Sequence, residues 1–353
     1  MKTNYTAIDL FQGVGGASLG LIKAGFKVVA ALDNDQEACD TYKKNFELKP
    51  ICDDLKNVSG TKILETFGIR KGDTDLLVGC PPCQGFSSLR RTRYPTMEDN
   101  RKELVTIFPE RVKEIAPKAV IFENVPGVAD VGGLPYFSEY LRVLGRLGFS
   151  TSWNFFDAVN YGVPQHRKRV IALSILGRES LLPLPTHANP RTKTNLKPWK
   201  TVRDTIANLP KLQAGQTDLS TPNHEARNHS DKILKLISLI PKDGGSWRDL
   251  PPELWLPCHV RLKDNKGAGN IYGRLWWDKP SGTMTCRCTS PSCGRFLHPE
   301  QNRAITPREA ACLQSFPMDY EFPEQKGSAE KQIGNAVPPD LLTVFAKTIK
   351  EYL

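Results

Sequence analysis

The first half of the chain alternates between short apolar runs and segments with helical spacing. Apolar runs typical of buried strands cover residues 6–11, 27–33, 75–79 and 119–125. Between them, apolar side chains recur at the spacing of a helix over residues 17–25, 36–46 and 105–115. Strands that alternate with helices predict an α/β fold, with a parallel sheet and helices on both faces. In such a sheet, ligands bind at the carboxyl ends of the strands.

The pattern changes near residue 176. Residues 183–204 are rich in proline and basic side chains, and regular spacing returns at residues 306–316 and 338–353. Thr306 suits a helix N-cap, with Pro307 at the first helical position and Glu309 at the third. We therefore expect a large domain over residues 1–175, a smaller loop-rich domain over 176–300, and a return to the large domain over 301–353.

Composition narrows the possible partners. The chain has 353 residues, with 48 Lys and Arg against 38 Asp and Glu, a net charge of +10. A basic balance favours a polyanionic partner, nucleic acid first, although a solvated lysine-rich surface would give the same count. No apolar run approaches the roughly 20 residues that span a bilayer, and the N-terminus lacks a secretory signal, so we expect a cytoplasmic protein with no membrane partner.

A glycine-rich turn follows the first strand. Gly13, Gly15 and Gly16 lie between a strand and a helix, and Asp33 ends the next strand twenty residues after Gly13. This arrangement lets backbone approach a ligand and lets an acid accept from ribose hydroxyls. Ser18 stands where a dinucleotide site has its third glycine, so a nucleoside cofactor without a pyrophosphate fits better. The alternative is a tight turn needed only for packing.

The stretch DLLVGCPPCQGFSS holds two cysteines at the end of a strand. Cys80 and Cys83 could form a redox pair or half of a zinc site, or Cys83 alone could be a nucleophile or a core residue. A cationic tract at residues 165–169 could lower the pKa of a nucleophilic thiol. Cys286, Cys288 and Cys293 could supply the further ligands that such a zinc site needs. These three cysteines could also bind zinc by themselves, with His259 or His298 as the fourth ligand.

At this point the sequence resembles the cytosine-C5 DNA methyltransferase family. Six segments look like its motifs in order: DLFQGVGG (9–16), GCPPCQGFS (79–87), FENVPG (122–127), QHRKR (165–169), REAACLQSFP (308–317) and QIGNAVPP (332–339). The resemblance covers nearly the whole chain except residues 176–275. It implies a Rossmann-like sheet that binds S-adenosylmethionine and a target-recognition domain over residues 176–300. The implied reaction methylates C5 of a cytosine flipped out of a specific duplex DNA sequence.

The resemblance also implies roles for single residues. Cys83 would add to C6 of the base, Glu123 would bind N3 and the exocyclic amine, Arg169 would meet O2, and Arg167 would support the cysteine loop or a phosphate. The implied cofactor residues are Phe11, Gly13, Gly15, Gly16, Asp33, Asp54, Leu104 and Asn335. A loop over residues 87–101 would close on DNA through Ser87, Arg90, Arg91 and Arg93.

Other functions are compatible with some of the same residues. An RNA or tRNA cytosine-C5 methyltransferase could use the same site, but the Cys-Phe-Thr element of the tRNA branch does not occur in the chain. A non-catalytic relative should lack Cys83, Glu123 or the glycines, and all are present. We expect a prokaryotic or phage modification enzyme, associated with the nucleoid, that acts as a monomer on double-stranded DNA and binds no metal. A cognate restriction endonuclease could be its functional, though not physical, counterpart.

Overall fold

The structure, a computed structural model, describes residues 4–82, 103–130, 134–179, 181–265 and 269–353. The chain divides into two units. The first comprises Met1–Tyr161, Lys168–Thr186 and Val337–Leu353, and the second comprises Gly162–Arg167 and His187–Ala336. No helix in the described part of the chain is both long enough and apolar enough to cross a membrane.

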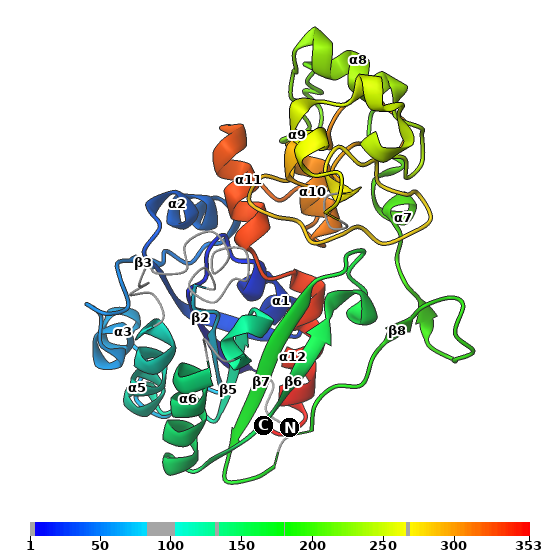
Figure 1. Cartoon of the computed structure of the whole chain (residues 1–353). Helices are drawn as coiled ribbons and strands as arrows, with labels where there is room; N and C mark the ends of the chain where they lie inside the picture. The colour runs from blue at the N-terminus through cyan, green and yellow to red at the C-terminus, as the bar shows by residue number, and fades with distance from the viewer. Residues whose placement is uncertain (1–3, 83–102, 131–133, 180, 266–268) are drawn as a thin grey trace. The chain divides into compact units, whose positions relative to one another are not determined.

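The first unit is built on a seven-stranded sheet with the order β3-β2-β1-β4-β5-β7-β6 (Figure 1). Its strands are β1 (Tyr5–Leu10), β2 (Phe26–Asp33), β3 (Ile51–Cys52), β4 (Leu76–Gly79), β5 (Ala119–Asn124), β6 (Phe149–Asp157) and β7 (Lys168–Leu176). The four strands predicted from apolar runs are confirmed as β1, β2, β4 and β5. These four and β3 pair in parallel, as expected for strands joined through helices.

The expectation of a wholly parallel sheet was wrong at one edge. Strand β7 lies between β5 and β6 and is antiparallel to both, with Glu123 opposite Ile171. Strands β6 and β7 are joined by a short segment that contains one 3₁₀ turn, η4 (Ala158–Tyr161), with no crossover helix. A connection of that length brings the chain back antiparallel, whereas a parallel return needs a longer crossover. The sheet is therefore mixed.

Helices cover both faces of this sheet, as predicted. They are α1 (Gly16–Lys23), α2 (Gln36–Asn45), α3 (Gly60–Phe67), α5 (Leu104–Ile115), α6 (Leu134–Arg146) and α12 (Pro339–Lys350), with a 3₁₀ turn, η3 (Pro126–Ala129), after β5. Helices α1 and α12 pack together on one face, and α3, α5 and α6 lie on the other. A Cβ at Gly20 would lie 2.7 Å from the carbonyl oxygen of Pro339, so the α1–α12 contact requires glycine there.

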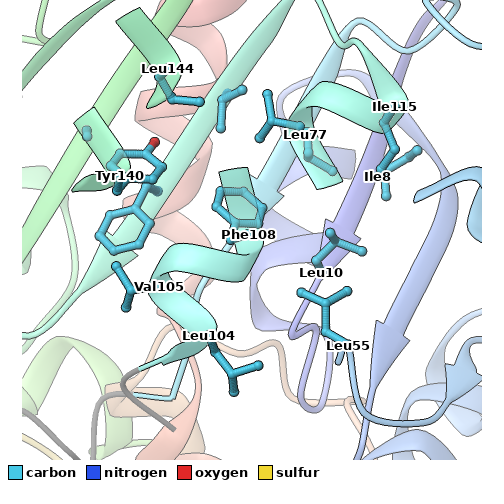
Figure 2. Packing of buried hydrophobic residues seen from close by; sticks show 14 of the residues in the cluster. Ile8, Leu10, Leu55, Leu77, Leu104, Val105, Phe108, Ile115, Tyr140 and Leu144 are labelled. Carbon is cyan, nitrogen blue, oxygen red and sulfur yellow. The ribbon is translucent and has the colours of Figure 1, made fainter. Parts of the chain in front are cut away.

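The main core lies between the sheet and α5 and α6 (Figure 2). Leu10 and Leu77 from neighbouring strands meet Phe108 of α5, and Phe108 stacks on Tyr140 of α6 with ring centroids 6.2 Å apart. All four side chains are fully buried. Burying one such side chain contributes about 1.5–3 kcal/mol, so this layer holds the strand ends rigidly in place.

The second unit has little regular structure, as its composition suggested. Its elements are β8 (His187–Ala188), β9 (Lys197–Pro198), α7 (Val202–Ile206), α8 (Asp231–Leu239), η5 (Trp247–Asp249), η6 (Pro252–Leu254), α9 (Pro257–Arg261), η8 (Pro291–Cys293), α10 (Pro307–Leu313) and α11 (Lys326–Asn335). A compact core around Trp247 includes Ile237, Tyr272 and Leu297. The predicted cap at Thr306 is confirmed: its hydroxyl accepts from the Glu309 backbone, and the Glu309 carboxylate accepts from the Thr306 backbone.

Residues 301–336 group with the second unit, although we expected the return to the first unit at residue 301. Helix α10 packs against α7. The guanidinium of Arg308 donates to the carbonyl oxygens of Pro222 and Tyr320 at 2.7 and 2.6 Å. These long-range bonds hold α10 within the second unit, and only Val337–Leu353, which contains α12, joins the first.

Candidate active site

The glycine turn between β1 and α1 is held by the acid that ends β2. Phe11, Gly13 and Gly15 all have positive φ, and the Phe11 backbone donates to the carbonyl of Leu32 at 2.8 Å. One carboxylate oxygen of Asp33 accepts from Gly13 N at 2.8 Å and the other from Asp35 N at 2.9 Å. The structure thus brings Phe11, Gly13 and Asp33 together. Burial raises the pKa of Asp33 above its ordinary value.

Gly15 is required by a close aromatic contact. Its φ is +89°, and a Cβ there would overlap the ring of Phe46. Phe46 in turn stacks on Tyr42 of α2, with centroids 4.3 Å apart. Any other residue at this position would have a strained backbone, and its Cβ would overlap the Phe46 ring, which is held by its stacking on Tyr42.

A buried polar group behind the turn was not anticipated from the sequence. Asp9 of β1 is fully buried and accepts from the Ser18 hydroxyl at 2.6 Å, and the hydroxyls of Ser18 and Tyr42 lie 3.0 Å apart. Burial raises the pKa of Asp9 to about 7. Ser18 therefore links α1 to Asp9 and Tyr42, which explains its presence at the place of a third glycine. The sequence signal was an acid inside an otherwise apolar strand.

Two other predicted cofactor residues, Leu104 and Asp54, lie at the start of α5 and just after β3. Leu104, the first residue of α5, is 3% exposed and belongs to the main core, against which Phe11 also packs. The carboxylate of Asp54 accepts from Lys56 N at 2.9 Å, while Asp53 accepts from Asp54 N at 2.6 Å. Asp54 is the less exposed of the two aspartates and follows β3 closely.

Glu123 and Arg169 form a buried ion pair at the carboxyl end of β5. Their side chains are 8% and 11% exposed, and Arg169 Nε lies 2.8 Å from Glu123 Oε1. The antiparallel pairing of β5 with β7 makes this possible, because Arg169 lies two residues from the partner of Glu123 on β7. The guanidinium also donates to the carbonyl of Lys168 at 2.7 Å, which fixes its orientation.

Residues 80–82, the described part of the cysteine loop, are held near this pair by two hydrogen bonds. Asn124, 1% exposed, donates through its side-chain amide to the carbonyl of Pro81 at 3.1 Å, and Cys80 N donates to the carbonyl of Leu10. Burial, followed by the negative charges of Glu123 and Asp9, raises the pKa of Cys80 well above its ordinary value. Cys80 therefore stays protonated and is a poor partner for redox chemistry. Cys83, Ser87, Arg90, Arg91 and Arg93 lie outside the described residues.

Arg167 and Asn335 belong to the second unit. Arg167 is 2% exposed, and its terminal nitrogens donate to the carbonyls of Met284, Gly334 and Ala336 at 3.0–3.3 Å. Asn335 ends α11, and its side-chain oxygen accepts from the thiol of Cys286 at 3.1 Å. The sequence suggested a phosphate or the cysteine loop for Arg167, and these carbonyl partners were not foreseen.

The residues considered for zinc are not gathered around one point. Cys288 is fully buried, whereas Cys286 is exposed. The ring of His259 stacks on Trp247 at 4.5 Å, and His298 Nδ1 accepts from the backbone of Glu300. Among the described residues, no group of three or more His, Cys, Asp or Glu side chains is placed to hold a metal ion.

The fold matches solved methyltransferases over its whole length. A prophage-encoded protein of E. coli, solved as a candidate DNA modification methyltransferase, aligns with a TM-score of 0.77 and 23% identity, covering 98% of this chain and 99% of that one. The Dnmt2 methyltransferase of S. pombe aligns with a TM-score of 0.64 and 15% identity, covering 99% of each chain. The class that the fold defines is thus the α/β fold that these proteins share.

Sequence similarity narrows the class to a family. The family model for C-5 cytosine-specific DNA methylases matches residues 5–351. The type II methylase M.HgiDII of Herpetosiphon aurantiacus is 37% identical, over 98% of this chain and 95% of that protein. The type II methyltransferase M1.HphI of Haemophilus parahaemolyticus is 35% identical, over 98% and 87%. The chain therefore belongs to the C-5 cytosine-specific DNA methylase family, and it is a DNA (cytosine-5-)-methyltransferase of the restriction–modification type.

Proposed function

We propose that the enzyme methylates C5 of a cytosine flipped out of a specific duplex DNA sequence, through a covalent bond between Cys83 and C6. The observation that carries this proposal is the buried Glu123–Arg169 pair, fastened beside the start of the cysteine loop by Asn124. A base inside the helix cannot reach a pair buried this deeply, so the target must leave the stack. The cost of unstacking is a few kcal/mol.

Glu123 and Arg169 suit the polar edge of cytosine. A carboxylate can accept from the exocyclic amine, and a carboxylic acid can hold a proton at N3 as negative charge enters the ring. Arg169 can donate to O2 while its ion pair keeps Glu123 oriented. Both interactions strengthen when the ring becomes more electron-rich, and interactions of that kind accelerate the chemical step.

Addition of the Cys83 thiolate to C6 makes C5 nucleophilic. When bound, S-adenosylmethionine supplies a methyl group on a sulfonium, an electrophile that C5 can attack. The proton on C5 is then removed by a base, and the electron pair it leaves forms the C5–C6 double bond as the sulfur–C6 bond breaks. The thiolate is thereby regenerated, and the sequence is covalent catalysis by an activated nucleophile.

The turn of the first unit fits such a cofactor. A Cβ at Gly13 would meet nothing within 4 Å, so the backbone there faces open space. The carboxylate oxygens of Asp33 accept from the backbone of Gly13 and Asp35, and a carboxylate, with about four lone-pair sites, can accept from a ribose hydroxyl as well. We assign cofactor binding to Phe11, Gly13, Gly15, Gly16, Asp33, Asp54, Leu104 and Asn335.

The DNA partner engages further parts of the chain in this proposal. Ser87, Arg90, Arg91 and Arg93 contact DNA phosphates, and residues within 176–300 read the target sequence. The net charge of +10 favours such contacts. The enzyme acts on double-stranded DNA as a monomer, and a restriction endonuclease with the same target is its functional counterpart.

The test traps the covalent intermediate. Bisulfite sequencing of host DNA, with and without the gene, first identifies the methylated sequence. A labelled duplex of that sequence with 5-fluorocytosine at the target is then incubated with the enzyme and S-adenosylmethionine, because fluorine at C5 blocks the final proton loss. We expect a stable adduct whose peptide map ends at Cys83, and none with Cys83→Ser. An adduct on another side chain, or none with an active enzyme, would refute the proposal. A tRNA substrate run in parallel tests the RNA alternative.

A further inference from the structure

The second unit contains a buried polar network that nothing in the proposed chemistry uses directly. Gln165, Arg167 and Gln314 are 0%, 2% and 0% exposed. The side chain of Gln165 donates to Gln314 Oε1 at 3.0 Å and accepts from Met284 N at 3.0 Å. Burying three polar side chains costs free energy unless each is hydrogen bonded, so the partners of these side chains show which segments the network connects.

The network holds the turn that follows α11. Gln314 donates to the carbonyl of Ile333 at 2.6 Å, and Arg167 donates to those of Gly334 and Ala336 at 3.0–3.2 Å. The last carbonyls of a helix have no partner within it, and a cation there satisfies both their bonding and the helix dipole. The hydrogen bonds of Arg167 therefore fix Gly334 and Ala336, the residues on both sides of Asn335.

The other side of the turn is fixed by backbone packing. A Cβ at Gly334 would overlap the backbone of Thr285 and Cys286, so the two segments lie in direct contact. Arg167 also donates to the carbonyl of Met284, and Cys286 donates to the side chain of Asn335. One arginine thus joins the segment at residues 284–286 to the turn that carries Asn335.

We infer that Arg167 is a positioning residue that sets the orientation of the Asn335 side chain, and that it does not contact DNA or the target base. This inference rests on the cofactor role that the proposed function gives Asn335. The fork of the guanidinium reaches two carbonyls of the turn at once, whereas a lysine ammonium offers a single point of contact. Withdrawing the guanidinium to bind a phosphate would remove the Arg167 bonds to the carbonyls of Met284 and Gly334, and would leave Ala336 O with only the 3.4 Å bond from Gln314.

The experiment compares Arg167→Lys with Arg274→Lys. Arg274 is a matched control because it is fully buried in the same unit and donates to carbonyls of Ile237, Ile240 and His298, which lie in other segments. Calorimetry on each full-length protein measures the Kd of S-adenosylhomocysteine without DNA, and urea unfolding measures stability. Steady-state assays at saturating cofactor measure kcat.

We expect R167K to raise the Kd of S-adenosylhomocysteine roughly tenfold, the effect of losing one or two hydrogen bonds that orient a binding group. Asn335→Ala should raise it similarly, and the double variant should be no worse than the poorer single, because both changes remove one contribution. R274K should lose stability but keep the wild-type Kd. If R167K does not fold, Gln314→Met loosens the same turn and should raise the Kd in the same direction.

Three results would overturn the inference. One is an unchanged Kd in folded R167K, another is additive effects of R167K and N335A, and the third is a loss of kcat at saturating cofactor with normal cofactor affinity. Wild-type protein that binds no S-adenosylhomocysteine would instead refute the proposed cofactor site, so the two failures are distinguishable.

Discussion

Glu309 holds the beginning of α10 from inside the second unit, and its replacement by glutamine tests what stabilises that unit. Its carboxylate is 1% exposed and accepts two bonds from Arg303, at 2.8 and 2.7 Å, and one from Thr306 N at 2.8 Å. Arg303 is itself fully buried. Glu309→Gln keeps the shape of the side chain but leaves the charge of Arg303 buried without its counter-charge.

The magnitude follows from the pKa of Glu309. Burial alone would raise it, but the charge of Arg303 and its hydrogen bonds outweigh burial and lower the pKa from 4.5 to about 2. At about 1.4 kcal/mol per pKa unit, this difference corresponds to about 3 kcal/mol of folding free energy at neutral pH. Breaking a buried ion pair by removing one partner typically costs about 3–5 kcal/mol. We therefore expect E309Q to lower the free energy of unfolding by about 3 kcal/mol.

Urea unfolding at pH 7, followed by tryptophan fluorescence, measures this loss. Five of the six tryptophans lie within residues 187–336, so the signal reports mainly on the second unit. Asp278→Asn is the matched control, because Asp278 forms a similar fork with Arg203 on the surface, at 2.6 and 3.0 Å. Exposed pairs contribute little, so the control should keep the wild-type midpoint. Equal shifts in E309Q and D278N would refute the reasoning.

Three further predictions concern catalysis, the glycine turn and pH. Glu123→Gln should slow methyl transfer by roughly 10²–10⁴-fold, as expected for loss of a group that positions a proton, and should leave the Kd of S-adenosylhomocysteine unchanged. Equal changes in the rate of methyl transfer and in this Kd would place Glu123 in the cofactor site. Gly15→Ala should lower the free energy of unfolding in urea by more than about 1 kcal/mol and should weaken cofactor binding, because its φ is +89° and its Cβ would overlap Phe46. Gly13→Ala should cost less stability, because its φ is +54° and its Cβ would face open space. A larger loss of stability in Gly13→Ala than in Gly15→Ala would contradict this account. Burial lowers the pKa of His298 from 6.5 to about 4, so the unfolded chain takes up a proton on this side chain before the folded protein does. The free energy of unfolding should therefore fall by up to about 3 kcal/mol as the pH drops from 6.5 to 4. Urea midpoints measured across that pH range should show a smaller loss in His298→Asn.

Local physics made much of the first unit predictable. The strands β1, β2, β4 and β5 are short apolar runs between helices, and burial on both faces of a parallel sheet demands that composition. The cap at Thr306 was predictable because its partner, Glu309, lies three residues away on the same helical turn. The order of the motifs likewise identified the family, since each motif lies within one short segment.

Tertiary structure decided what depends on distant partners. The antiparallel course of β7 brings Arg169 to Glu123, 46 positions away in the sequence, and no local sequence pattern predicts that pairing. The carbonyls that hold Arg167 lie at residues 284–336, and the hydrogen bonds of Arg308 keep α10 in the second unit. Side-chain type and spacing alone can show that a residue is suited to a role. Which group it meets depends on long-range packing, because burial and hydrogen bonding are settled only when separate segments come together.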